Sequence, residues 1–202
     1  DNTYYIITYN YDANTNKYDT NTNNYDTSTK KYNTTIDADA AATAAAAILC
    51  IQEGISLNVI KGSLNNFMGI DRRMQILGSK KIKTHHCTYI DDYGHHPTEI
   101  KKTIEAIRDS YPAHKVIMIF QPHRFTRTKD LFEEFVEVLK SVERLILLEI
   151  YSAGEESIEG ISSSTLLESI KNAGLEDVFL AKSNDQAYEL IENIISMEKG
   201  VL

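Results

Sequence analysis

The feature that most constrains the fold is a regular alternation of apolar runs and amphipathic segments after Gly78. Apolar runs of strand length occur at residues 88–91, 115–121, 144–150 and 178–180. Segments with helical periodicity follow them at residues 97–110, 128–140, 163–173 and 184–195. Strands alternating with helices of this length are typical of parallel sheets, because each parallel connection needs a crossover. We predict an α/β fold with a doubly wound, mostly parallel, Rossmann-like sheet, whose ligands collect at the carboxyl ends of the strands.

Length and composition limit the class of protein further. A chain of 202 residues with 42% hydrophobic and 25% charged residues can bury an ample core. The formal charge of −8 argues against a nonspecific nucleic-acid binder. No apolar run approaches the roughly 20 residues of a membrane span, and Asp1 opens no signal-peptide pattern, so we expect a cytoplasmic protein without a nucleic-acid or membrane partner. Cys50 and Cys87 have no CxxC spacing and are expected to be reduced thiols.

The first 36 residues form a low-complexity repeat in which tyrosine recurs every seven residues. The recurring positions are Tyr4, Tyr11, Tyr18, Tyr25 and Tyr32. A coiled coil is excluded because only one apolar position recurs in each repeat. A polar β-meander and disorder both remain open, and we predict no catalytic role for the repeat.

A partial helical segment precedes the alternating region. An Ala-rich helix is expected from Ala38 to a glycine cap at Gly54, followed by a short helix at residues 57–68 and a connector. The predicted organisation is therefore a repeat at residues 1–36, a partial helical segment with its linker at 37–78, and an α/β domain at 79–202.

Two polar segments lie where predicted strands give way to helices. Residues 91–99 read DDYGHHPTE, and residues 120–128 read FQPHRFTRT. Arg124 and Arg127 are expected in a loop, where guanidinium groups three residues apart can converge on one carboxylate or phosphate. The predicted helix that begins at Pro97 would add backbone N–H groups to the same edge. We predict a shared anion pocket at this edge.

Less specific interpretations of the same residues stay open. Asp91 or Asp92 could only cap the helix that begins at Pro97, and Arg124 and Arg127 could be solvated surface charges. A metal site at His95 and His96 is disfavoured, because adjacent histidines point apart and no HxH or HExxH spacing supports one. Arg72 and Arg73 could be a solvated pair or a phosphate contact, and residues 153–155 a simple turn.

Three segments together resemble the Mur ligase family. They are residues 91–99, 120–128 and 149–155, the last of which reads EIYSAGE. They are similar to the C-terminal domain of the UDP-N-acetylmuramate–L-alanine ligases, and the Tyr93-Gly94 pair is typical of that member. Residues 67–78, FMGIDRRMQILG, resemble the bridge that leads into this domain. The resemblance implies that residues 37–78 are a remnant of the central ATP-binding domain with its linker, and that residues 79–202 are the C-terminal domain.

The resemblance implies ATP-dependent ligation of L-alanine to UDP-N-acetylmuramate in peptidoglycan synthesis, with Mg²⁺ and an acyl-phosphate intermediate. It implies that Asp92, His95 and Arg124 are catalytic. The implied nucleotide contacts are Arg73, Asp92 and Tyr93, and no residue is assigned to a metal. The implied substrate contacts are Tyr93, His95, His123, Arg124 and Arg127.

The sequence also departs from the family pattern. It contains no glycine-rich P-loop that ends in Gly-Lys-Thr or Gly-Lys-Ser. The Gly-x-His-Asn-x-x-Asn segment of the family aligns with Ala38, Asp39 and Ala42, none of which matches. We also expect no UDP-binding domain, and no last strand with its Gly-rich turn, within this sequence. We expect the chain to be inactive alone, and two alternatives remain: a catalytically dead nucleotide- or anion-binding module, or an inert α/β domain with a repeat-based interaction segment.

Overall fold

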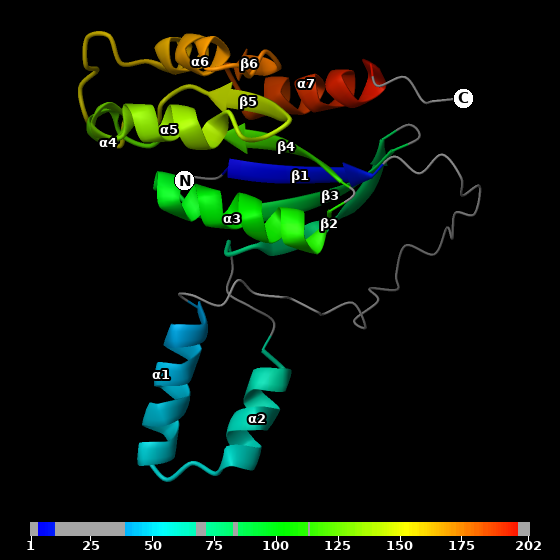
Figure 1. Cartoon of the computed structure of the whole chain (residues 1–202), viewed down its shortest axis with the longest axis vertical. Coiled ribbons are helices and arrows are strands. Elements are labelled where there is room, and N and C mark those ends of the chain that lie inside the picture. The colour runs from blue at the N-terminus through cyan, green and yellow to red at the C-terminus, as the bar shows by residue number, and fades with distance from the viewer. Residues whose placement is uncertain (1–3, 11–38, 68–71, 83–84, 113, 198–202) are drawn as a thin grey trace. The chain divides into compact units, whose positions relative to one another are not determined.

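The computed structural model of the chain describes residues 4–10, 39–67, 72–82, 85–112 and 114–197 (Figure 1). The chain divides into two compact units, one formed by Asn21–Asp71 and the other by Asp1–Thr20 with Arg72–Leu202. Most of the tyrosine repeat, the middle of the connector and the chain end at Val201 and Leu202 lie outside the described residues.

The larger unit is built on one six-stranded sheet. In spatial order the strands are β2 (Gln75–Ile82), β3 (His85–Asp92), β1 (Tyr4–Asn10), β4 (Lys115–Phe120), β5 (Arg144–Leu148) and β6 (Val178–Ala181). The α/β class is confirmed, and β4, β5 and β6 are parallel as expected. The sheet as a whole is mixed, because the pairings of β2 with β3, β3 with β1, and β1 with β4 are antiparallel.

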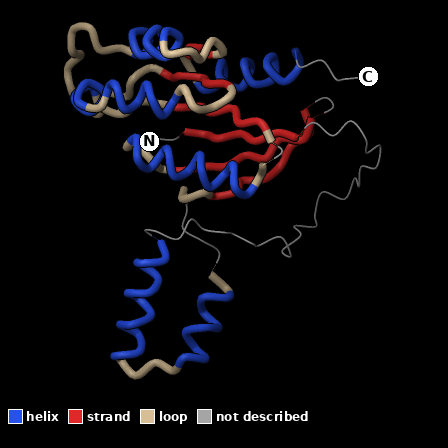
Figure 2. The backbone as a smooth tube through the Cα atoms, viewed as in Figure 1, coloured by secondary structure: helices blue, strands red, loops and turns tan. Residues whose placement is uncertain are grey.

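Helices cover both faces of this sheet (Figure 2). One face packs against α3 (Pro97–Ser110), α5 (Phe132–Leu139) and α6 (Ser163–Asn172), and the other against α7 (Asn184–Met197). In Figure 1, α3 and α5 lie in front of the strands. The predicted helices at 97–110, 163–173 and 184–195 are thus present with small shifts of their ends.

β4 carries the continuously apolar run VIMIF because both of its faces are buried. Met118 and Phe120 belong to the core beneath α3, α5 and α6, whereas Ile117 and Ile119 belong to the core beneath α7. Side chains alternate across a strand, so a strand covered on both faces needs apolar residues at every position.

The predicted helix at 128–140 is divided in two. The structure has α4 (Phe125–Asp130) and α5, separated at Leu131, whose φ of −116° and ψ of 23° are not helical. The half-buried Leu131 packs against the core, which holds the chain in this break. Because α4 begins at Phe125, before the predicted start at residue 128, Arg127 lies on α4 rather than in the loop where we expected it.

The central position of β1 was not predicted. Residues 4–10 form a strand between β3 and β4 and pair with both. Because β3 and β4 each run antiparallel to β1, they are parallel to each other, and β5 is parallel to β4. The carboxyl ends of β3, β4 and β5 therefore meet at one edge of the sheet.

The smaller unit contains α1 (Asp39–Gln52) and α2 (Leu57–Asn65), which confirms the expected Ala-rich helix and its short successor. Gly54 has a φ of 81°, the left-handed conformation that ends helices. Large apolar side chains such as Leu49 and Val59 are 62% and 58% exposed, and Ile60 is the one described core residue of this pair. No helix among the described residues is long and apolar enough to cross a membrane.

Candidate functional site

Asp92 joins the end of β3 to the residues that precede β2. Its Oδ2 accepts the backbone N–H of Met74 at 2.9 Å, and its Oδ1 accepts that of Gly94 at 2.7 Å. The N–H of Tyr93 also donates to the carbonyl of Arg72 at 2.6 Å. Asp92 is 4% exposed, so its carboxylate works as a buried acceptor that holds two chain segments together.

The residues held in this way have an uncommon backbone conformation. Arg72 and Met74 have φ values of 59° and 48°, in the left-handed region that costs a non-glycine residue on the order of 1 kcal/mol or more. Nε of Arg72 lies 3.5 Å from Oδ2 of the buried Asp91. Burial raises the pKa of Asp91, while the charge of Arg72 opposes that shift. We call residues 72–74 and the Asp92 carboxylate that holds them the β3 clamp.

Tyr93 extends from the clamp with two guanidinium groups beside it. The Cζ atoms of Arg72 and Arg73 lie 4.8 Å and 6.0 Å from the centre of its ring, which is the geometry of cation–π contacts. The ring of His95 meets that of Tyr93 edge-on, with 5.5 Å between centres. The exposed fraction of Tyr93 is 38%, so an aromatic surface with positive charges beside it remains accessible.

The start of α3 is closed by a capping box that involves both histidines. Nδ1 of His96 accepts the N–H of Thr98 at 3.2 Å, and Pro97 occupies the first helical position. The carboxylate of Glu99 accepts the N–H groups of His95 and His96 at 3.0 Å and 3.1 Å. His96 is therefore a helix cap, a role that our sequence analysis considered for the aspartates instead.

Glu99 is a site residue that we missed. Nη1 of Arg73 lies 3.6 Å from its carboxylate, so Glu99 connects the β3 clamp to α3. Partial burial would raise the pKa of Glu99, but the backbone N–H groups of His95 and His96 and the nearby cations together hold it below its usual value. The signal was present in the sequence, since an acidic residue three positions after a cap is typical of a capping box.

The segments that follow β4 and β5 continue the pairing of those strands. Tyr151 donates its N–H to the carbonyl of Pro122 at 2.9 Å, and Arg124 donates its N–H to the carbonyl of Tyr151 at 2.8 Å. His123 and Tyr151 form a parallel bridge, with their rings stacked 5.4 Å apart. These contacts fix Arg124 with a φ of 71° immediately before α4.

His123 supports one of the two arginines. Nη1 of Arg127 lies 3.2 Å from Nδ1 of His123, so the neutral ring can accept a hydrogen bond from the guanidinium. Burial lowers the pKa of His123, and the charges of Arg127, Arg124 and His95 lower it further. His123 is thus neutral near pH 7, and it lies within electrostatic reach of His95.

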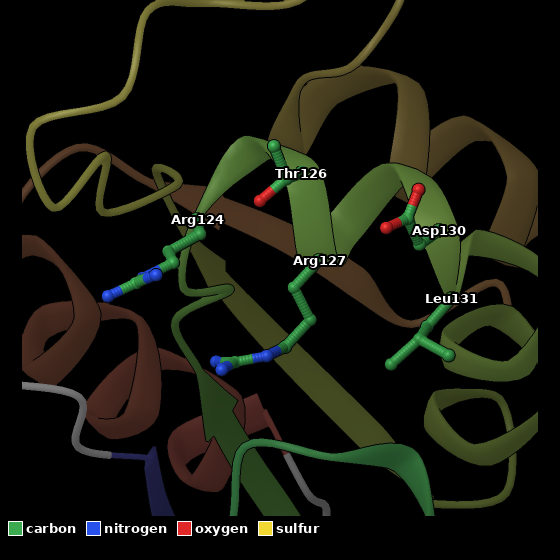
Figure 3. Close-up of a pocket in the computed structure, with 5 residues that line it drawn as sticks. All are labelled: Arg124, Thr126, Arg127, Asp130 and Leu131. Atoms are coloured by element: carbon green, nitrogen blue, oxygen red, sulfur yellow. The ribbon is translucent and has the colours of Figure 1, made fainter.

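Arg124 and Arg127 line a pocket of about 350 Å³ together with Thr126, Asp130 and Leu131. Figure 3 shows the two arginine side chains extending to the same side of α4. Among the described residues, no carboxylate lies within ion-pair distance of either guanidinium. Two guanidinium groups at one pocket that form no ion pair with a described carboxylate are suited to binding an anion.

Residues 153–155 form more than a simple turn. Ala153 and Gly154 do turn the chain, with φ values of 51° and 86°. The turn brings the carboxylate of Glu155 to Thr126, whose N–H and hydroxyl it accepts at 3.0 Å and 2.7 Å. The hydrogen bonds from the N–H and hydroxyl of Thr126 lower the pKa of Glu155. Sequence reasoning missed this link because it depends on two loops meeting.

The predicted site residues therefore fall into two neighbouring groups at one sheet edge. Arg124 and Arg127 line the pocket, with His123 beside Arg127. A second group, with Arg73, Tyr93 and His95, gathers where β3 ends and α3 begins. Asp92 lies beneath this second group rather than in the pocket, with both oxygens accepting backbone N–H groups.

The described residues do not fit a Mg²⁺ site of their own. No group of three or more His, Cys, Asp or Glu side chains in this part of the chain could hold a metal ion. Asp92 and Glu99 already accept backbone N–H groups with their carboxylates. We therefore assign no metal ligand among the residues that the structure describes.

Comparison with known proteins identifies the family. Residues 72–202, more than half of the chain, match the model of the Mur ligase family described as "Mur ligase, glutamate ligase domain". The chain is also 41% identical over 142 residues to a UDP-N-acetylmuramate–L-alanine ligase of Methylococcus capsulatus. That match covers 70% of this chain and 30% of the relative, so the chain spans less than a third of that protein. The chain belongs to the Mur ligase family and carries its C-terminal domain.

Proposed function

We propose that this chain supplies the amino-acid-binding part of an ATP-dependent ligase that joins L-alanine to UDP-N-acetylmuramate in cytoplasmic peptidoglycan synthesis. The single observation that carries the proposal is the pocket in which Arg124 and Arg127 face the same side without an acidic partner among the described residues. The name of the Methylococcus capsulatus relative supports the choice of reaction.

In this proposal Arg124 and Arg127 bind carboxylate or acyl-phosphate oxygens, and His123 holds Arg127 in place. Guanidinium groups fixed before the reaction stabilise the negative charge that develops when the amine attacks the acyl group. His95 and Tyr93 lie at the adjacent strand end, where they contact the substrates. The main contribution of the domain is to orient the amine toward the activated carboxylate.

The nucleotide contacts are assigned to the other group. Arg73 and Tyr93 offer a cation and an accessible aromatic ring. Asp92 acts mainly through the clamp, because both of its oxygens already accept N–H groups, and a ribose hydroxyl would need one of their remaining lone pairs. ATP and Mg²⁺ supply the activation of the carboxylate when the missing P-loop is provided by the rest of such an enzyme.

Binding tests the proposal on the chain itself. L-alanine and inorganic phosphate are titrated separately into ¹⁵N-labelled protein, and amide shifts are followed. With phosphate we expect saturable amide shifts at residues 123–127. In Arg124→Ala the affinity for phosphate should fall about tenfold or more, since charge-assisted bonds contribute about 1.5–3 kcal/mol. Absence of saturation for wild-type protein with both probes contradicts the anion pocket.

Activity distinguishes a ligase part from a catalytically dead module. The Methylococcus capsulatus relative, shortened by the region that this chain matches, is mixed with this chain, ATP, Mg²⁺, UDP-N-acetylmuramate and L-alanine. We expect product only when both polypeptides are present, and none from this chain alone. Ligation by the isolated chain contradicts its predicted inactivity, whereas phosphate binding without any restored ligation favours the dead module.

A further inference from the structure

Glu155 connects the loop after β5 to the first turn of α4. Its Oε2 accepts the N–H of Thr126 at 3.0 Å, and its Oε1 accepts the hydroxyl of the same residue at 2.7 Å. A carboxylate that engages two groups of one residue restricts both distance and direction. The residue that it holds lies between the two arginines that line the pocket.

The start of α4 depends on this contact. Arg124 occupies the cap position with a φ of 71°, and its side chain makes no capping hydrogen bond. The first N–H groups of a helix lack partners within the helix and need an acceptor from elsewhere. Glu155 accepts the N–H of Thr126 from a different loop, which is the task that a serine or aspartate cap performs locally.

The negative charge of Glu155 would weaken anion binding at the pocket, whereas its hydrogen bonds to Thr126 would support it. A carboxylate near the pocket repels an anion. The pKa of Glu155 is lowered by its hydrogen bonds from Thr126 and also by the charge of Arg124, although no ion pair joins Glu155 to a described arginine. If charge alone mattered, removing Glu155 would strengthen anion binding. If the hydrogen bonds matter, removing it would weaken binding, so the two roles predict opposite signs.

We propose that Glu155 is a positioning residue for the anion pocket, which holds the first turn of α4 so that Arg124 and Arg127 face one ligand. The inference rests on the proposed function for the nature of that ligand. The geometry of the two loops can be tested without any ligand.

The test compares Glu155→Ala, Glu155→Gln and the matched control Glu156→Ala in the complete chain, with inorganic phosphate as the probe. Glutamine can keep both contacts, since its oxygen accepts the N–H and its amide donates to the hydroxyl of Thr126. We expect Glu155→Ala to weaken phosphate binding at least about fivefold, as loss of the two hydrogen bonds to Thr126 predicts, with Glu155→Gln and Glu156→Ala within about twofold of wild type.

Rescue by glutamine is the readout that a charge effect cannot produce. Unchanged or tighter phosphate binding in Glu155→Ala overturns the proposal, and so does a loss in Glu155→Gln as large as that in Glu155→Ala. Amide hydrogen exchange of the ligand-free protein separates this test from the proposed function. Faster exchange at residues 126–128 in Glu155→Ala, but not in Glu156→Ala, supports the positioning role even where wild-type protein binds no phosphate, and equal exchange in both variants overturns it.

Discussion

The β3 clamp and the α4 pocket each contain two arginines, yet their surroundings differ in kind. Arg72 and Arg73 each lie within ion-pair distance of a carboxylate, and both lie over Tyr93. Arg124 and Arg127 line an open pocket, and no described carboxylate lies within ion-pair distance of either guanidinium. The difference teaches that the clamp arginines stabilise a chain junction, whereas the pocket arginines are available to a ligand.

The largest effect on stability is expected from Asp92→Ala. The substitution leaves the buried N–H groups of Met74 and Gly94 without their acceptor, which we expect to lower the free energy of unfolding by about 3 kcal/mol. Urea denaturation followed by circular dichroism measures the loss. Asp109→Ala, at an exposed position on α3, is the control. Equal losses of unfolding free energy in the two variants would contradict the structural role of Asp92.

A smaller loss, about 1–2 kcal/mol at pH 7, is expected from Arg72→Ala, because the partly buried Asp91 then lacks its cation. Burial raises the pKa of Asp91, so the folded protein binds a proton there more readily than the unfolded chain does. Protonation removes the unpaired charge, and the deficit should therefore shrink as the pH falls through this raised pKa.

Urea denaturation of Arg72→Ala between pH 7 and pH 4 measures this trend, with Lys102→Ala as the control. Lys102 forms an exposed ion pair with Glu105 at 3.1 Å, a kind of pair that contributes little. A deficit for Arg72→Ala that stays constant or grows toward low pH would contradict the coupling to Asp91.

Thr128→Val probes the support beneath the pocket. The buried Thr128 hydroxyl donates to the carbonyl of Arg124 at 2.8 Å, and its removal is expected to cost about 1 kcal/mol. Thr103→Val removes the equivalent bond to the carbonyl of Glu99 in α3, which makes it a matched control. We expect both variants to lose similar stability in thermal unfolding, but only Thr128→Val to bind phosphate more weakly. Equal phosphate binding in the two variants would argue against a role of Thr128 in supporting the pocket.

The smallest effect on stability is expected from the double variant Arg124→Ala/Arg127→Ala. Neither guanidinium has an acidic partner among the described residues, so the free energy of unfolding should change by less than about 0.5 kcal/mol while phosphate binding is lost. Arg124→Lys/Arg127→Lys keeps the charges without the planar fork and should bind phosphate with intermediate affinity. A large loss of stability in the alanine variant would mean that Arg124 and Arg127, like the arginines of the β3 clamp, stabilise the fold.

Much of the larger unit could be predicted from local patterns. The alternating runs locate β4, β5 and α3, because each element carries its own periodicity and caps. The break at Leu131 could not be predicted, since it depends on packing of that side chain against the core. The position of β1 was equally hidden, because strand pairing with β3 and β4 joins segments far apart in the chain.

The candidate site shows the same division between features set by local sequence and features set by tertiary packing. Residue types and spacing alone determined the α/β class and the strand ends at which polar side chains gather, and the motifs at residues 91–99, 120–128 and 149–155 carried the resemblance to the family. Only the tertiary structure decided that Asp92 is a buried clamp and that Glu155 holds Thr126. The physical reason is that helix and strand patterns repeat within a few residues, whereas a hydrogen bond between segments far apart in the chain depends on how the strands bring those segments together.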